Sequence, residues 1–310
     1  MITREVSMFL RGIGTLLVIL AHYSQWYITV ESGNVIWYLM TKLGRYGVAV
    51  FFLVSGYGLV FSAKKGLEAR WIIRRVMHVY FPYFCIEGIL HLVEERRWTL
   101  YSFVKYIVGL DAWFVFVIVM FYILFWFVWK FSVHKILWMS IGVAAVSFSL
   151  AVGMRDSVWY ASNTAFLAGV VAGQYDREIS TWLSDKKGRI SLVLLMAFLC
   201  SGGIYSFYQD RSTGIYLLGK SVASALWAMF LVSFFSGREV ESRKVSILGT
   251  ASLEIYLIHV FVLDRVDILL DRVNAVTVLG IGILLSFALG VLIHWMFEVI
   301  NRKISLLDRS

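Results

Sequence analysis

Ten apolar segments, each about twenty residues long, recur along this sequence, and that length is what a helix needs to cross a bilayer. Backbone polar groups find no water in the hydrocarbon layer, so segments of this kind fold as helices. The predicted spans are residues 8–30, 44–62, 76–95, 112–131, 136–154, 159–175, 190–208, 215–236, 247–265 and 276–299. The predicted fold class is therefore all-α, a polytopic membrane helix bundle of about ten transmembrane helices.

Composition excludes a soluble globular protein, because 60% of the residues are hydrophobic and only 16% are charged. The first apolar segment lacks a small-residue cleavage site, so we expect a retained helix rather than a signal peptide. Residues 96–110 mix basic and apolar side chains, which is typical of a helix lying in the membrane interface. We expect residues 1–310 to form one integral-membrane domain with no separate soluble part.

Basic residues predict the orientation of the bundle. The net charge of +9 could suggest nucleic-acid binding, but the basic residues lie in short loops between spans, as orientation signals do. With ten spans, eighteen basic residues fall on one side and seven on the other. The basic side contains residues 63–75, 176–189 and 237–246 and both chain ends, which we therefore predict to be cytoplasmic. No nucleic-acid partner is expected.

Two ionisable residues, Arg11 and His22, lie inside the first span, where such groups are costly. Eleven positions separate them, which is three helical turns plus about 20° and a rise of about 16 Å. Both side chains therefore lie on one face of the helix and could line one internal path. The alternative is that Arg11 reaches the lipid headgroups and His22 makes an interhelical hydrogen bond.

Proline and cysteine are rare in this chain. Its single proline, Pro82, lies within the third span, where we expect it to kink or break the helix. Cys85 and Cys200 both lie in apolar runs, so we expect buried thiols and no disulfide. No spacing typical of a metal site or a phosphate-binding loop occurs, and no metal is predicted.

Several motifs occur together in a fixed order, and as a set they resemble the acyltransferase 3 family of integral-membrane acyltransferases. The motifs are Leu10-Arg11-Gly12 with His22, Gly44 to Tyr57 with the pattern GxxGVxxFFxxSGY, Arg74-Arg75 with Pro82-Tyr83, Trp113-Phe114, and Ser252 to His259 with the sequence SLEIYLIH. The resemblance implies ten core helices and transfer of acyl groups, usually acetyl from acetyl-CoA, to hydroxyls of cell-envelope sugars. The family's functional residues match His22, Arg11 and Arg74 or Arg75. Many members carry an acidic residue before the Leu-Arg motif, where this chain has Ser7, Met8 and Phe9.

Acyl transfer from a thioester to a hydroxyl needs a base and stabilisation of an oxyanion. His22 is the candidate catalytic residue, as general base or as acyl carrier, with Arg11 guiding the donor toward it. The nucleotide phosphates of acyl-CoA need a basic site at the cytoplasmic mouth, for which the candidates are Arg74, Arg75, Lys64 and Lys65. These four could instead be orientation signals alone. The possible supporting residues near His22 are Glu254, Tyr256 and His259.

The predicted function is thus a membrane O-acyltransferase of the plasma (inner) membrane. Its expected partners are acyl-CoA as donor substrate, a saccharide or glycolipid acceptor and the lipid bilayer, with no permanently bound cofactor. The competing hypothesis is a polytopic transporter of an envelope precursor, because buried charges and a broken helix also occur in carriers. A glycan flippase or sensor without chemistry is a third class.

Overall fold

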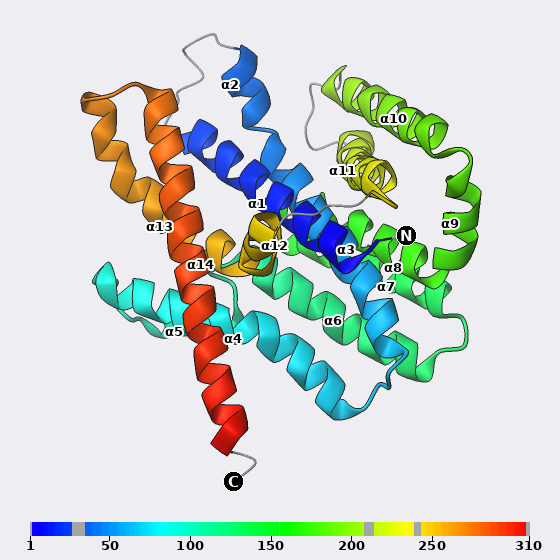
Figure 1. Ribbon diagram of the computed structural model, residues 1–310, viewed down its shortest axis with the longest axis horizontal. Helices are drawn as coiled ribbons and strands as arrows, with labels where there is room; N and C mark the ends of the chain where they lie inside the picture. Colours follow the sequence, from blue (N-terminus) through cyan, green and yellow to red (C-terminus); the bar gives the residue numbers. More distant parts are fainter. Residues whose placement is uncertain (1, 27–34, 155, 208–213, 239–242, 308–310) are drawn as a thin grey trace.

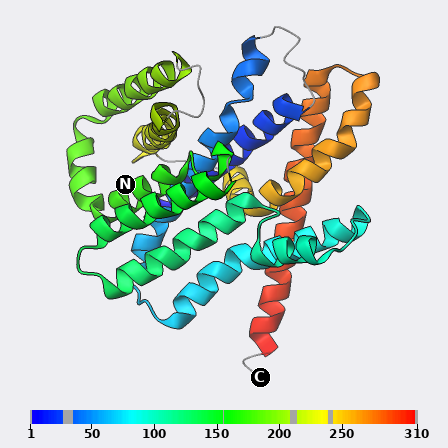
Figure 2. The ribbon, with the colours of Figure 1, turned by 180° about the vertical axis from the view of Figure 1, so that it is seen from behind.

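The computed structural model describes residues 2–26, 35–154, 156–207, 214–238 and 243–307, and within these ranges it contains helices and no strand. Figures 1 and 2 show the arrangement from two opposite sides. The elements are α1 (Arg4–Trp26), α2 (Val35–Met40), α3 (Leu43–Ala63), α4 (Ala69–Val93), α5 (Leu100–Val108), α6 (Trp113–Phe131), α7 (Lys135–Met154), η2 (Ser157–Trp159), α8 (Asn163–Gln174), α9 (Asp176–Ser184), α10 (Lys187–Phe207), α11 (Gly214–Phe235), α12 (Arg243–Thr250), α13 (Ser252–Val266), η3 (Asp267–Asp271) and α14 (Ala275–Leu307). The all-α prediction is confirmed.

Seven of the helices in the described ranges are long and apolar enough to cross a membrane. They are Arg4–Trp26, Ile36–Ala63, Ala69–Val93, Trp113–Phe131, Lys135–Gly153, Gly214–Phe235 and Ala275–Ile300. The chain is therefore an integral membrane protein, while the count of ten spans and the orientation stay predictions. Arg155, Arg211 and Arg309, which contributed to the orientation prediction, lie outside the described residues.

Two predicted spans take a different form in the structure, and a third reaches the edge of the described residues. Residues 159–175 contain α8, whose twelve residues rise only about 18 Å, less than the hydrocarbon thickness. Residues 247–265 are divided between α12 and α13, which meet at Ala251. The predicted span 190–208 corresponds, as far as residue 207, to α10, a helix of 21 residues that ends next to residues outside the described part.

The centre of the bundle is α3, which packs between α1 and α8 (Figures 1 and 2). Every residue from 46 to 54 is buried, as expected for a helix that is apolar all round. Small residues allow these helices to approach closely. A Cβ atom on Gly169 of α8 would collide with the backbone of Leu53, and one on Gly47 would collide with the carbonyl of Gly14 in α1.

The outer helices expose their large apolar side chains. On α7 these include Leu137, Trp138 and Phe148, and α14 exposes Leu284 and Trp295. Exposed apolar side chains on helices of this length are expected to face lipid. Cys200 is also exposed, so the prediction that both cysteines are buried is wrong for it, while Cys85 is half-buried.

Two local predictions concern α4 and α5. The sequence predicted a kink or break at Pro82. Helix α4 is not broken there, because it runs through this residue from Ala69 to Val93. The predicted interfacial helix in residues 96–110 is present as α5, which exposes Leu100, Tyr101 and Phe103. An amphipathic helix of this kind suits the boundary between lipid and water.

Candidate active site

His22 of α1 faces His259 of α13. The Nδ1 atom of His22 lies 2.7 Å from the Nε2 atom of His259, and the two ring planes are inclined by only 14°. On α1 itself, the ring of Trp26 stacks on His22 with centroids 4.6 Å apart. His259 is 1% exposed, whereas His22 is half-buried. The structure therefore brings together two residues that lie 237 positions apart in the sequence.

The backbone of α13 determines which nitrogens of this pair carry protons. The Nδ1 atom of His259 is hydrogen-bonded to the carbonyl oxygen of Tyr256, and a carbonyl can only accept. In a neutral His259 the Nε2 atom is then unprotonated and accepts the bond from Nδ1–H of His22. The remaining nitrogen of His22, Nε2, consequently carries a lone pair. This is the protonation state that a base or an acyl-accepting nucleophile needs.

Arg11 lies near Arg75, a residue of α4. The two guanidinium groups interact electrostatically, and the Tyr122 hydroxyl of α6 acts on Arg11 as well. Arg75 donates to Oγ of Ser62 at 2.5 Å, and Nε1 of Trp71 donates to the same oxygen at 2.8 Å. Two like charges from different helices held in one region repel each other, and a bound anion relieves that repulsion.

A second set of ionisable residues adjoins these arginines. Glu254 of α13 is buried, and its Oε1 lies 3.0 Å from Nδ1 of His294 in α14. Its Oε2 atom has no hydrogen-bond partner in the part of the chain that the structure describes. His78 of α4 interacts electrostatically with Glu254, Arg11, Arg75 and His294. One polar region is thus built from α1, α4, α13 and α14.

Sequence reasoning proposed neither His78 nor His294 as a site residue. One signal was present, since His78 follows Arg75 by three positions and residues at that spacing share a helix face. His294 carried no comparable signal, because its partner Glu254 lies on another helix.

The other predicted site residues separate into two groups. Tyr256 is buried beside the site, with its ring centroid 5.6 Å from that of His259 and 5.2 Å from that of Phe114. By contrast, Arg74, Lys64 and Lys65 are exposed, and the Lys64 ammonium lies 4.3 Å from the ring centre of Phe61. Of the four basic residues predicted at the donor site, the structure brings Arg75 toward Arg11 and leaves these three at the surface.

No group of three or more histidine, cysteine, aspartate or glutamate residues suited to a metal occurs in the described ranges. The ionisable groups that the site contains are imidazole, guanidinium and carboxylate groups. These groups can move a proton and stabilise negative charge.

A family model described as an acyltransferase domain matches residues 8–295. The chain belongs to the acyltransferase 3 family. The match includes α1 with Arg11 and His22, α4 with Arg75, and α13 with His259. No curated protein and no solved structure matches the chain.

Membership in this family makes the protein an enzyme that transfers acyl groups, and its helices make it a membrane acyltransferase. A transporter without acyl chemistry does not agree with this assignment.

Proposed function

We propose that the protein transfers an acyl group, most simply acetyl, from cytoplasmic acyl-CoA to a hydroxyl of a cell-envelope saccharide or glycolipid in the plasma membrane. His22 acts as the general base or as the acyl carrier. The observation that carries this proposal is the hydrogen-bonded series from the Tyr256 carbonyl through His259 to His22, which leaves a lone pair on Nε2 of His22.

In the general-base route, Nε2 of His22 takes the proton of the acceptor hydroxyl as its oxygen attacks the thioester carbonyl. The C–S bond then breaks, and the departing CoA sulfur receives that proton from Nε2 of His22. In the carrier route, Nε2 itself attacks the thioester carbonyl, the C–S bond breaks and CoA leaves as the thiolate. The acceptor oxygen then displaces the acyl group from the imidazole, and the hydroxyl proton passes by way of the freed imidazole to the CoA sulfur. Both routes require the same unprotonated nitrogen.

His259 supports either route through its bond to His22. When Nε2 of His22 gains positive character, the bond from Nδ1–H to His259 becomes a charge-assisted one and strengthens. The group that orients His22 is thus the imidazole of His259, which is polarised by the Tyr256 carbonyl. Many family members carry an acid just before the Leu-Arg motif, where this chain has Ser7, Met8 and Phe9.

Arg11 and Arg75 are the proposed site for the phosphates of the donor. Both belong to the same polar region, and arginine suits phosphate because its guanidinium donates in a fork. Arg11 precedes His22 by eleven residues, or about 16 Å along α1. The extended pantetheine arm of CoA must span a comparable distance to place the thioester at the imidazole.

The test uses the full chain in lipid nanodiscs with radiolabelled acetyl-CoA and a membrane extract of envelope glycans as acceptor. We expect His22→Ala to lower acetyl transfer at least about a hundredfold while the protein stays monodisperse. His134→Ala removes an exposed histidine from the turn before α7 and is the matched control, which should transfer normally. Near-normal transfer by a folded His22→Ala protein overturns the mechanism, and an intact thioester with wild-type protein overturns the proposed activity.

Two further measurements refine the proposal. Intact-protein mass spectrometry after exposure to acetyl-CoA without acceptor separates the routes, because only an acyl carrier gains the mass of one acetyl group. Mass spectrometry of envelope glycans from a deletion strain should reveal loss of the ester that the enzyme adds.

A further inference from the structure

The end of α3 contacts the proposed donor site through one hydroxyl group. Ser62 is the penultimate residue of α3 and is half-buried. Its Oγ atom accepts a hydrogen bond from Nη2 of Arg75 at 2.5 Å and another from Nε1 of Trp71 at 2.8 Å. Arg75 is the residue of α4 that lies near Arg11, so Ser62 bonds directly to one of the two arginines proposed to hold the donor.

These two bonds restrict what the Ser62 hydroxyl can do next. A hydroxyl oxygen has two lone pairs and one O–H group. Arginine and tryptophan side chains only donate, so Arg75 and Trp71 occupy both lone pairs and cannot accept the serine proton. That proton has no acceptor in the part of the chain that the structure describes. The O–H group can therefore donate to a ligand, and accepting from a cation makes it a stronger donor.

Backbone contacts hold Ser62 at this position. Its carbonyl oxygen accepts from the N–H of Lys65 at 3.1 Å, which closes the turn after α3. In the connection to α4, the carbonyl of Leu67 accepts from Nε1 of Trp126 in α6 at 3.1 Å. The hydroxyl is thus presented by a turn that is bonded to the bundle on both sides.

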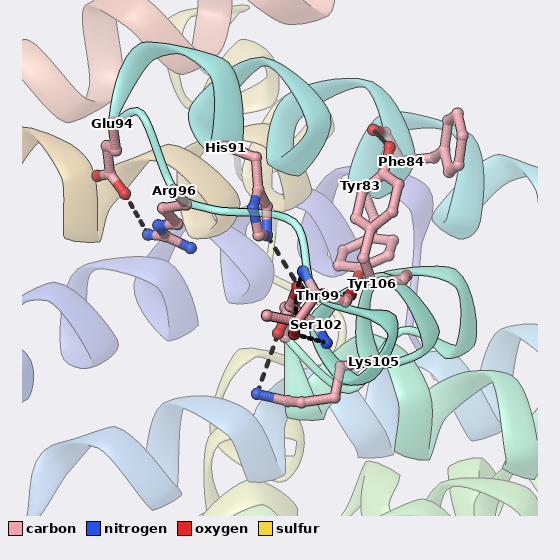
Figure 3. A network of polar contacts seen from close by, with 10 residues as sticks. Tyr83, Phe84, His91, Glu94, Arg96, Thr99, Ser102, Lys105 and Tyr106 are labelled. Atoms are coloured by element: carbon pink, nitrogen blue, oxygen red, sulfur yellow. Dashed lines mark hydrogen bonds and ion pairs between the residues drawn. The ribbon is translucent and has the colours of Figure 1, made fainter.

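Helix α4 is held by contacts that do not involve the Ser62 hydroxyl. Near its start, the ring of Trp71 packs against that of Phe125 in α6, with centroids 6.1 Å apart. Farther along, the Tyr83 hydroxyl donates to the carbonyl of Tyr106 at 2.8 Å, which ties α4 to α5 (Figure 3). We therefore expect the backbone of α4 to keep its place when the hydroxyl is removed. What the hydroxyl orients is the guanidinium bonded to it.

A neutral partner leaves the charge of Arg75 available. Within the described ranges Arg75 forms no ion pair with a carboxylate, and Glu254, the acidic residue of this region, bonds His294 instead. Ser62 holds the guanidinium without neutralising it, although Arg11 repels it. The site therefore combines two positive charges with a hydroxyl donor, which is the complement of a diphosphate.

The distance along α1 selects among the phosphates of acyl-CoA. This molecule carries a diphosphate at the end of its pantetheine arm and a third phosphate on the ribose beyond it. Arg11 lies about 16 Å along the helix from His22, a distance comparable to the extended arm. With the thioester at His22, the group that reaches Arg11 and Arg75 is the diphosphate.

We propose that Ser62 is a donor-binding residue, whose oxygen holds the Arg75 guanidinium toward Arg11 and whose hydroxyl proton bonds an oxygen of the donor diphosphate. This assignment rests on the proposed function, because the diphosphate is that of acyl-CoA. Ser62 lies at the phosphates and not at the thioester, so it affects the binding of the donor and not the transfer at His22.

The test measures CoA binding and acetyl transfer separately, with the full chain in lipid nanodiscs. Ser62→Ala should weaken CoA binding in isothermal titration calorimetry and raise the KM for acetyl-CoA, each about tenfold, with kcat and the acceptor KM unchanged. Ser62→Thr keeps the hydroxyl and should bind CoA nearly as the wild type does. Ser140→Ala is the matched control, because this half-buried serine of α7 donates to the carbonyl of Ile136 in its own helix. It should change neither quantity.

Shortened donors show which phosphate the serine contacts. 3′-Dephospho-CoA keeps the diphosphate, so Ser62→Ala should weaken its binding by the same factor as that of CoA. S-Acetylpantetheine has no phosphate, and its KM should not respond to Ser62→Ala. An equal rise in KM for S-acetylpantetheine would mean that the variant distorts the site, and a loss seen with CoA but not with 3′-dephospho-CoA would assign Ser62 to the ribose phosphate. Either result overturns the inference.

A double-mutant cycle tests the contact between Ser62 and Arg75. If the serine oxygen holds the guanidinium, the effects of Ser62→Ala and Arg75→Gln on CoA binding should be less than additive. Full additivity overturns the positioning role. If Ser62→Ala leaves CoA binding unchanged while acetyl transfer proceeds, the inference fails and the proposed function stands. If CoA binds in a Ser62-dependent manner but no acetyl group is transferred, the binding site stands and the proposed function fails.

Discussion

His22 of α1 and His259 of α13 are joined by a hydrogen bond of 2.7 Å between Nδ1 and Nε2. Family resemblance marks His22 for the chemistry, and the structure adds the reason why its other nitrogen is free. The Tyr256 carbonyl accepts from Nδ1 of His259, so the direction of each bond in the series is determined. Under the proposed function, His259 is a positioning residue whose effect passes through His22.

The first prediction follows from this relationship. His259→Ala removes the acceptor for Nδ1–H of His22, so the imidazole loses its fixed tautomer and orientation. We expect kcat to fall about tenfold to a hundredfold with little change in the donor KM. His259→Gln can still offer an amide oxygen to His22 and should recover part of the rate. Equal rates for the alanine and glutamine variants, with both proteins folded, would contradict a positioning role.

A second prediction separates the adjacent arginines of α4. Arg75 lies near Arg11, whereas Arg74 is exposed. Arg75→Gln should therefore raise the KM for acetyl-CoA by the loss of one charge-assisted bond, about 1.5–3 kcal/mol, while the acceptor KM stays near normal. Arg74→Gln is the matched control and should change the donor KM less than twofold. Similar effects of the two variants on donor binding would mean that both act only through the general positive charge at this end of α4.

A third prediction concerns the packing of α8 on α3. Gly169→Ala would drive a methyl group into the backbone of Leu53, which cannot rotate away as a side chain can. Overpacking of this kind costs about 1–3 kcal/mol, so we expect a clear fall in the thermal unfolding temperature. Gly58→Ala, in α3, meets no atom within 4 Å and is the control. An unchanged unfolding temperature for Gly169→Ala would show that the two helices can separate at no cost.

Seven of the ten spans predicted from hydropathy correspond to described helices that are long and apolar enough to cross a membrane. The apolar run at 112–131, for example, corresponds to Trp113–Phe131, and that at 276–299 lies within Ala275–Ile300. It did not predict the division of residues 247–265 at Ala251. Close packing accompanies this division, because Gly249 of α12 lies against the backbone of Met8. Such a contact leaves no mark on the local periodicity.

The candidate site could be predicted where its residues share one helix. The spacing of Arg11 and His22 placed both on one face of α1, and this required only helix geometry. The partners that complete the site come from other helices, as His294 does for Glu254. Which of the basic residues between 64 and 75 turns inward also depended on packing, since Arg75 bonds Ser62 while Arg74 stays exposed.

A last prediction tests the number of crossings between α5 and α9. Two described helices between Tyr101 and Lys186, α6 and α7, satisfy the length and hydropathy of a span, and two crossings would place both residues on the same side. The ten-span hypothesis adds a third crossing through residues 159–175, where α8 has only twelve residues. We favour the third crossing because α8 packs against α3, the central helix of the bundle. The short helix η2 lies directly before α8 and lengthens this helical segment. A membrane-crossing segment enclosed by protein can contain a helix shorter than the bilayer, because the backbone groups beyond the helix ends can form hydrogen bonds with protein instead of facing lipid.

Charge favours the same result. Residues 176–189 carry four basic side chains, and the positive-inside rule places them in the cytoplasm, away from α5. Single cysteines at Lys186 and Tyr101, in a background without Cys85 and Cys200, should therefore react with an impermeant thiol reagent from opposite sides of sealed vesicles. Tyr101 is well exposed, and a second cysteine at Leu100 on α5 serves as a check that this helix is accessible. Labelling of the Lys186 and Tyr101 positions from the same side would reduce the crossings here to α6 and α7, and would place α5 on the same side of the membrane as the basic residues of 176–189.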